Sequence, residues 1–208
     1  MHVPESYLHQ RVGALGYRVL GLDIDGVCAD YTSAFREFCS ARMNLPESSF
    51  PEPTAYNLVA AGWPFSSVDE YLKYHREAVE DGLYARVPAY AGVSEALWSL
   101  SSADVHVRIV SHRLFLSGLH RVIVRDTADW LERQDIPYMS LCMTGLKDSI
   151  EATVYVEDSP SMIRALRKAG SDVVIFDQPY NRDLAGARFS DWRQGGELLL
   201  SRLGSELG

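Results

Sequence analysis

Two aspartates stand two residues apart in the segment GLDIDGVCAD, residues 21–30. Asp23 ends the apolar run 17–23, and Gly26 lets the chain turn sharply after Asp25 because it lacks a Cβ atom. Two carboxylates at one site can divide a displacement reaction, one attacking as a nucleophile and the other moving protons. Asp and Gly are also common turn residues, so a plain acidic turn after a strand is the alternative. The spacing favours chemistry over that alternative.

Three later apolar runs end in polar residues in the same way. They are VHVRIV (105–110) before Ser111, TVYV (153–156) before Glu157 and Asp158, and DVVIF (172–176) before Asp177. Short apolar runs that are bounded by polar residues predict buried strands. The segment MSLCM (139–143) is a weaker candidate for a further strand.

Helical patterns over residues 118–134 and 160–169 alternate with these strands. Alternation of strand and helix implies right-handed crossovers and a parallel sheet that is covered on both faces. The predicted fold class is therefore α/β, with a three-layer Rossmann-like core. Ligands of such sheets bind at the carboxyl ends of the strands, which is where the polar residues fall.

The stretch 30–100 interrupts this alternation and predicts a small helical cap inserted after the first strand. Its helical segments are 31–42, 68–80 and 92–101, with a proline- and aromatic-rich segment between the first two. The core would then consist of residues 1–29 and 101–208, with a partly helical lead-in over residues 1–16. A cap in this place would lie above the strand ends and act as a lid.

Four motifs in this order resemble the haloacid-dehalogenase-like (HAD) superfamily of hydrolases. They are the pair Asp23 and Asp25, Ser111 in VRIVSHR, Lys147 in TGLKDS, and Glu157 with Asp158 in VYVEDSP. Taken singly, Ser111 could be an ordinary strand-end serine and Lys147 a solvated loop lysine, but four motifs in order are far more specific than any one. A dehalogenase would need only Asp23. Asp25 suits phosphoryl transfer instead, because an alkoxide leaving group needs a proton.

The resemblance implies a catalytic role for four of these residues. Asp23 would be the nucleophile that becomes an aspartyl-phosphate. Asp25 would protonate the leaving oxygen as a general acid and then activate water as a general base. Ser111 would hydrogen-bond the transferring phosphoryl oxygens, and Lys147 would neutralise charge on the phosphoryl group and on the nucleophile.

The resemblance also implies Mg²⁺ as the cofactor. Asp158, the Asp23 carboxylate and the Asp25 backbone carbonyl would bind the ion, and Glu157 would lie in the layer behind these ligands. The chemistry asks for such an ion independently, because neighbouring carboxylates repel one another and a phosphate dianion. A hard cation with oxygen ligands relieves that repulsion and stabilises charge on the transferring group. Zinc is disfavoured because neither His nor Cys joins the motif residues.

Three further segments resemble the 5′(3′)-deoxyribonucleotidases of this superfamily: DGVCADYTSAF, LYARVPAYAGVSEALWSL, and the tail FDQPYNRD with RFSDWRQ. The similarity spans roughly residues 17–195 and implies a nucleoside monophosphate as the substrate. Two other interpretations stay open. One is a HAD phosphatase for a sugar phosphate or another small metabolite, and the other is a catalytically silent module that binds phosphate or a nucleotide.

A nucleotide base needs a flat apolar slot, and aromatic rings supply stacking of about 1–3 kcal/mol per base. Four aromatic residues in the expected cap or at its edges are candidates for this slot, with ordinary cap core as the alternative: Tyr31, Trp63, Phe65 and Tyr84. His112 and Arg113 follow Ser111 directly and could contact ribose or phosphate, although the deoxyribonucleotidases usually carry small residues there. His75 lies in a helix face that we expect to be solvated, and no role is assigned to it.

The composition limits the partners and the location of the chain. The formal net charge of −8 disfavours nucleic-acid polymers and anionic membranes as partners. Three widely spaced cysteines without a CxxC pair fit a reducing compartment. The sequence has neither a stretch of ~18 apolar residues nor the apolar region of a secretion signal. We expect a cytoplasmic protein that acts on a small phosphate ester, and a homodimeric state stays open.

Overall fold

The computed structural model describes residues 18–204 of the 208-residue chain. The expected lead-in over residues 1–16 lies outside the described residues. Among the residues described, no helix combines the length and the apolar character that crossing a bilayer requires.

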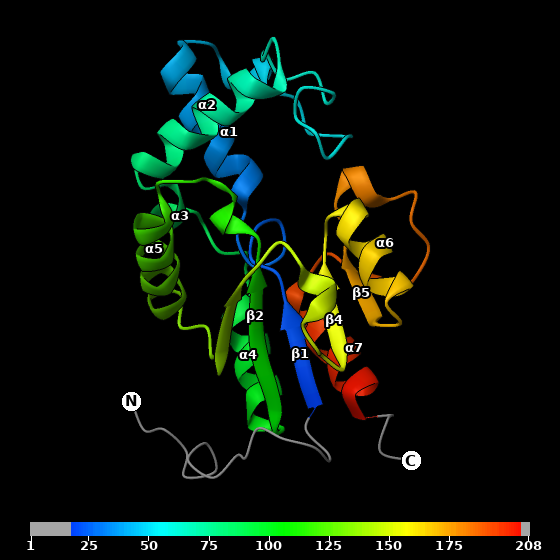
Figure 1. Ribbon diagram of the computed structural model, residues 1–208. Helices are drawn as coiled ribbons and strands as arrows, with labels where there is room; N and C mark the ends of the chain where they lie inside the picture. Colours follow the sequence, from blue (N-terminus) through cyan, green and yellow to red (C-terminus); the bar gives the residue numbers. More distant parts are fainter. Residues whose placement is uncertain (1–17, 205–208) are drawn as a thin grey trace.

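A six-stranded parallel sheet forms the centre of the molecule (Figure 1). Its strands are β1 (Arg18–Leu22), β2 (Val105–Ser111), β3 (Ser140–Met143), β4 (Val154–Glu157), β5 (Asp172–Phe176) and β6 (Arg188–Phe189). Their order across the sheet is β3-β2-β1-β4-β5-β6. The predicted α/β class is confirmed, and β6 is a short edge strand that the sequence pattern does not predict. β1 lies between β2 and β4, so the residues that follow these three strands meet at one edge.

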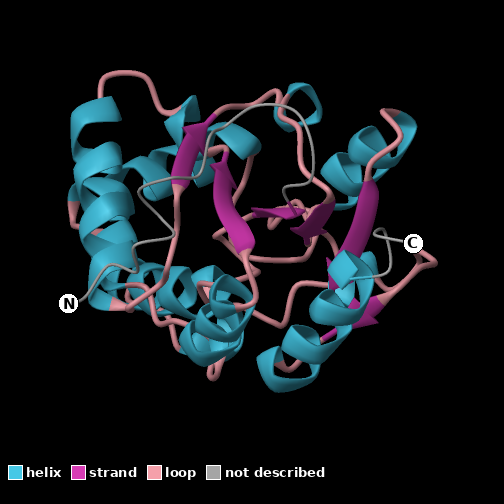
Figure 2. Cartoon of the chain, turned by 90° about the horizontal axis from the view of Figure 1, so that it is seen from below, coloured by secondary structure: helices cyan, strands magenta, loops and turns pink. Residues whose placement is uncertain are grey.

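Helices cover both faces of the sheet (Figure 2). The helices α4 (Val93–Ser102), α5 (His120–Arg133) and α7 (Trp192–Gly204) bury apolar side chains on the face of Leu20 and Leu22. Helix α6 (Pro160–Lys168) packs on the other face, against Tyr155 and Ile175. Successive side chains of a strand point to opposite faces, and this alternation produces the three layers.

A helical cap stands above the carboxyl ends of the strands (Figure 1). It contains α1 (Tyr31–Met43), α2 (Val68–Glu80), α3 (Leu83–Arg86) and the short turn η2 (Glu47–Ser49). Side-chain N-caps begin the two long helices, because Asp30 accepts a hydrogen bond from the Ser33 backbone and Ser67 accepts one from Glu70. The cap has an apolar core of its own, built around Phe35.

The cap ends earlier than residue 100, where the sequence pattern places its boundary. Val93, Leu97 and Leu100 of α4 are buried with the sheet rather than with the cap, and α4 packs against α7. An amphipathic helix has the same apolar periodicity whether it covers a sheet or a cap, so the pattern alone cannot assign it. By packing, the chain returns to the core near Val87.

Two chain segments join the cap to the core, and they are hydrogen-bonded to each other. Ala29 and Ala89 form an antiparallel bridge, the Asp30 backbone N–H donates to Pro88 O (2.8 Å), and Tyr90 N–H donates to Cys28 O (2.8 Å). The cap is therefore anchored within a few residues of Asp25.

Candidate active site

Three carboxylates converge at the carboxyl ends of β1 and β4. Asp23 follows β1, Glu157 ends β4 and Asp158 comes next, and one side-chain oxygen from each lies within 4.8 Å of the others. Parallel pairing of β1 with β4 brings these residues together. The hydrogen bond from the Asp23 backbone N–H to Val156 O (3.2 Å) continues the pairing one residue beyond β1. The structure thus brings together residues that are 134 positions apart in the chain.

Lys147 closes this cluster from the turn η4 (Lys147–Ser149). Its Nζ atom lies 2.8 Å from Asp23 Oδ1 and 2.7 Å from Glu157 Oε2, and the residue is only 3% exposed. Burial alone would lower the pKa of Lys147, but its two carboxylate partners more than offset this effect and raise the pKa above its ordinary value. The ammonium group therefore keeps its charge beside the Asp23 oxygens.

Burial and mutual repulsion disfavour the charged forms of Asp23 and Asp158. Burial, together with the charge of Glu157, raises the pKa of Asp23 to about 7, although Lys147 acts in the opposite direction. Burial and Glu157 likewise raise the pKa of Asp158 well above its ordinary value. Such shifts are typical of functional sites, where like charges are held together.

Asp25 is paired with Arg113 of the turn η3 (Arg113–Phe115). Arg113 Nε and a terminal nitrogen donate to the two Asp25 oxygens at 2.8 and 2.6 Å, which is a bidentate pair. The guanidinium is buried, lies 4.1 Å from the ring centre of Tyr84, and donates to Thr127 Oγ1 (3.0 Å). The sequence suggested Arg113 as one of two residues that could contact ribose or phosphate; in the structure its side-chain donors bind Asp25 and Thr127.

Ser111 and His112 take different positions at the end of β2. Ser111 is buried, and its hydroxyl accepts a hydrogen bond from the Arg113 backbone N–H (3.3 Å). His112 lines the pocket and packs so closely on Gly145 that a side chain there would overlap its ring. This contact, with the hydrogen bond from Thr144 N–H to Ser111 O (2.8 Å), sets the loop that carries Lys147.

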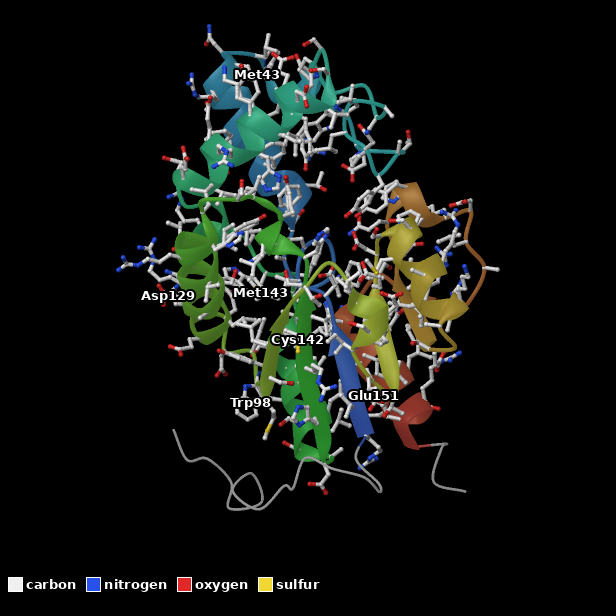
Figure 3. The ribbon with its side chains drawn as sticks, viewed as in Figure 1. Met43, Trp98, Asp129, Cys142, Met143 and Glu151 are labelled. Atoms are coloured by element: carbon white, nitrogen blue, oxygen red, sulfur yellow. The ribbon has the colours of Figure 1, made fainter. Side chains whose placement is uncertain are left out.

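A pocket of about 480 Å³ lies between this acidic edge and the cap. In Figure 3, Met143 marks the carboxyl end of β3 and Met43 marks the far end of the cap. Tyr31 and Tyr84 line the pocket, as expected of two of the aromatic candidates. Trp63 and Phe65 do not reach it. They pack with Phe35 in the core of the cap, and Trp63 Nε1 donates to the backbone of Pro51 (2.8 Å).

His75 is a pocket residue that sequence reasoning missed. It is buried rather than solvated, its Nδ1 atom lies 3.2 Å from the Tyr71 hydroxyl, and its Nε2 atom lies 3.0 Å from the Tyr84 hydroxyl. Burial lowers the pKa of His75 to about 4, so the ring is neutral at pH 7. Tyr71 and His75 are four residues apart and therefore lie on one face of α2. This spacing is the sequence feature that could have predicted their contact.

Four further aromatic pocket residues have no role assigned from the sequence, although Tyr180 lies in the segment FDQPYNRD. They are Tyr56, Tyr71, Phe115 and Tyr180. Phe115 exposes 44% of its surface and stands edge-on to His75, with 5.2 Å between ring centres. An exposed aromatic ring in a pocket wall can stack on a planar ligand.

The donor set fits a hard divalent cation. The cluster of Asp23, Glu157 and Asp158 consists of carboxylates alone, and these oxygen ligands suit Mg²⁺. With Asp25 included, four carboxylates stand against two cations among the described residues, Lys147 and Arg113. A phosphate dianion would add to this negative excess, and a bound divalent cation would offset it.

Comparisons with known proteins agree with this geometry. A family model described as 5′ nucleotidase, deoxy (pyrimidine), cytosolic type C protein matches residues 17–203. A protein from Chlorobaculum tepidum, provisionally named a 5′(3′)-deoxyribonucleotidase, is 33% identical over 176 residues, which cover 84% of this chain and 86% of that protein.

Solved structures share the fold at low sequence identity. A predicted phosphatase from Clostridium acetobutylicum aligns with a TM-score of 0.62 at 12% identity, covering 89% of this chain and 99% of that one. The Bacillus subtilis protein YfnB, provisionally described as a HAD-hydrolase and crystallised with magnesium, aligns with a TM-score of 0.53 at 14% identity and the same coverage of both chains. Both likenesses concern the architecture of core and cap.

Proposed function

Because this chain belongs to the family described as 5′ nucleotidase, deoxy (pyrimidine), cytosolic type C, we propose that it removes the phosphate from deoxyribonucleoside monophosphates with the help of Mg²⁺. It is a phosphoric monoester hydrolase of the HAD superfamily. The observation that carries the proposal is the contact of Lys147 with Asp23, inside a carboxylate cluster that faces an aromatic cap. The family description and the reduced cysteines also suit the cytoplasm.

In the first half-reaction, an Asp23 oxygen attacks phosphorus and forms an aspartyl-phosphate. The bond from phosphorus to the ester oxygen breaks, and that oxygen takes a proton from Asp25. Lys147 stays beside the attacked carboxylate and stabilises the charge that develops on the phosphoryl oxygens. Ser111, at the end of the neighbouring strand β2, is our candidate for a hydrogen bond to those oxygens.

In the second half-reaction, water attacks the phosphorus of the aspartyl-phosphate. Asp25 now accepts the proton of that water, and phosphate leaves with Asp23 restored. Asp23, Asp158 and the Asp25 backbone carbonyl would hold Mg²⁺, which when bound offsets the charge of the phosphate. Glu157 would neutralise Lys147 from behind, as its ion pair indicates.

Arg113 governs the availability of Asp25 in this scheme. Its bidentate pair occupies both side-chain oxygens of Asp25. While both oxygens are held by the guanidinium, neither is placed to transfer a proton to the leaving group. We therefore expect Asp25 to turn from Arg113 toward the substrate before the first half-reaction.

The cap and the turn η3 supply the site for the nucleoside. Tyr31, Tyr84 and Phe115 offer rings in the pocket wall, and the neutral ring of His75 lies among them. Aromatic faces bind a planar base by stacking. This apolar lining favours a nucleotide over a sugar phosphate, whose hydroxyls would need polar partners.

A substrate panel tests the proposal directly. Purified protein is assayed with Mg²⁺ for phosphate release from 5′- and 3′-deoxyribonucleotides, ribonucleotides and sugar phosphates. We expect the highest kcat/KM for a deoxyribonucleotide. A clear preference for sugar phosphates would refute the nucleotidase assignment, and release of phosphate from none of the esters would favour a silent binding module.

A further inference from the structure

The turn η5 (Pro179–Asn181), which follows β5, holds Asp158 by both its side chain and its backbone. The Tyr180 hydroxyl donates a hydrogen bond to Asp158 Oδ2. Asn181 is fully buried, and its Nδ2 atom donates to the Asp158 backbone carbonyl (2.8 Å) and to Phe176 O (2.9 Å). No motif of the sequence analysis assigned these residues a role. The hydrogen bonds leave Asp158 little freedom to rotate.

Gln178, which precedes η5, extends this set of hydrogen bonds to the loop after Asp23. We call the hydrogen bonds made by Gln178, Tyr180 and Asn181 the brace. Its Nε2 atom donates to Gly26 O (2.8 Å) and to the Tyr90 hydroxyl (3.0 Å), and its backbone N–H donates to Asn181 Oδ1 (3.1 Å). One turn therefore fixes both sides of the acidic cluster, the Gly26 loop and Asp158.

Asp158 Oδ2 is enclosed on two sides. A methyl group on Gly26 would overlap this oxygen, and it would also lie 3.1 Å from the Tyr180 hydroxyl. Gly26 has φ +79, which a residue with a side chain rarely adopts. With Oδ2 packed against Gly26 and bonded to Tyr180, the other oxygen, Oδ1, is the one available to a ligand in the cluster.

We propose that Tyr180 is a positioning residue that restricts Asp158 to binding a metal ion through one oxygen and thereby selects Mg²⁺ over Ca²⁺. Mg²⁺ is small and requires few, well-placed oxygens, whereas Ca²⁺ takes six to eight ligands and accepts both oxygens of one carboxylate. A carboxylate that cannot rotate therefore favours the smaller ion. The inference rests on the proposed function only in taking the cluster to be a metal site.

Direct metal binding tests this role without any substrate. Titration calorimetry of the full chain, first stripped of metal, gives the Kd values of Mg²⁺ and Ca²⁺ for the wild type, Tyr180→Phe and Tyr90→Phe. Tyr180→Phe removes the hydroxyl from Asp158 and leaves the ring. Loss of a partner that orients a metal ligand costs about 10–100-fold in affinity. We expect that loss for Mg²⁺ but a smaller one for Ca²⁺, so that the preference for Mg²⁺ falls about tenfold.

Tyr90→Phe is the matched control, because it removes a hydroxyl from the same brace without touching Asp158. Its Mg²⁺ to Ca²⁺ preference should equal that of the wild type. Equal weakening of both ions by Tyr180→Phe, or no weakening, would overturn the inference. A wild-type chain that binds neither ion would instead remove the metal site from the proposed function. If Tyr180→Phe fails to fold, Tyr180→His and Tyr180→Leu replace it. Tyr180→His keeps a donor group and should retain more of the preference for Mg²⁺ over Ca²⁺ than Tyr180→Leu. Equal preferences in these two variants would refute the positioning role of Tyr180.

Discussion

At the residue scale, the two aspartates of the first motif have separate surroundings and should have separable roles. Asp23 contacts Lys147, whereas Asp25 contacts Arg113. Asp23→Asn should lower kcat by about 10⁴-fold or more, because an amide is a poor nucleophile. Asp25→Asn should lower kcat by about 10²–10⁴-fold through lost proton transfer. Rapid-quench assays of phosphate release with a deoxyribonucleotide measure both, and near-normal turnover by Asp23→Asn would contradict the mechanism.

Arg113 offers a choice between orienting Asp25 and binding substrate. If it orients Asp25, Arg113→Met should lower kcat by about 10²-fold, the size of effect that a small misplacement of a catalytic group produces. KM should change little, and Arg113→Lys should recover part of the rate because one hydrogen bond can remain. Steady-state kinetics separate the two parameters. A raised KM with unchanged kcat would restore Arg113 to the substrate-binding role that the sequence suggests.

His75 should make stability depend on pH. In the folded chain its pKa is lowered from 6.5 to about 4 by burial, so between these values the unfolded chain binds a proton that the folded chain does not. The free energy of unfolding is therefore unaffected by His75 protonation above pH 6.5. It falls as the pH drops toward 4, by about 3 kcal/mol at most. Urea unfolding at pH 7.5 and pH 5 measures it. His75→Gln should lose less stability than the wild type over that interval, and equal losses would count against the buried neutral ring.

At the element scale, the sequence predicts which residues lie at the strand ends, but it does not predict which side chains contact them. Asp23, Ser111 and Asp158 each follow a short apolar run, and parallel strands carry such residues to one edge whatever the loops do. Adjacency to Ser111 suggested that Arg113 contacts the substrate. Adjacency in sequence does not determine the direction in which a side chain points. Trp63 looked like a stacking residue because an aromatic ring in a cap has the same sequence signal in the cap's core as in the pocket.

The cap boundary and the brace show a second limit of sequence patterns. Helix α4 has apolar periodicity that fits either layer, and its contacts with β2 and α7 assign it to the core. Tyr180 and Asn181 lie 22 and 23 residues after Asp158. Their hydrogen bonds depend on the pairing of β4 with β5, which brings the ends of both strands together. Contacts of this kind follow from topology and leave no local periodicity.

The loop after β1 allows a controlled test of close packing. Gly26 and Gly62 both have positive φ, at +79 and +86, but only a side chain at Gly26 would overlap Asp158. Each Gly→Ala variant should lose about 1 kcal/mol of stability from backbone strain. Gly26→Ala should lose more, and it alone should weaken Mg²⁺ binding. Urea unfolding and calorimetry give the two quantities. Normal Mg²⁺ affinity in Gly26→Ala would mean that the overlap is relieved without moving Asp158.

At the scale of the whole molecule, the acidic cluster should tie stability to the metal ion. Because the folded chain holds Asp23 with a pKa of about 7 and Asp158 also raised, it binds protons more tightly than the unfolded chain. The metal-free protein should therefore lose stability as the pH rises through about 7. Mg²⁺ at 100 times its Kd should add about 2.7 kcal/mol and lessen this loss, since the ion replaces the protons.

Asp158→Asn separates the repulsion from the binding. Removing one carboxylate from the cluster of three relieves repulsion, so the variant should be more stable than the wild type in a chelator at pH 8. Its stability should gain little from Mg²⁺, because a ligand is gone. Thermal unfolding of the wild type and the variant is compared with and without Mg²⁺, at pH 6 and at pH 8. A variant that is less stable than the wild type in chelator and still stabilised by Mg²⁺ would mean that the Asp158 side chain serves the fold through Tyr180 rather than the cation.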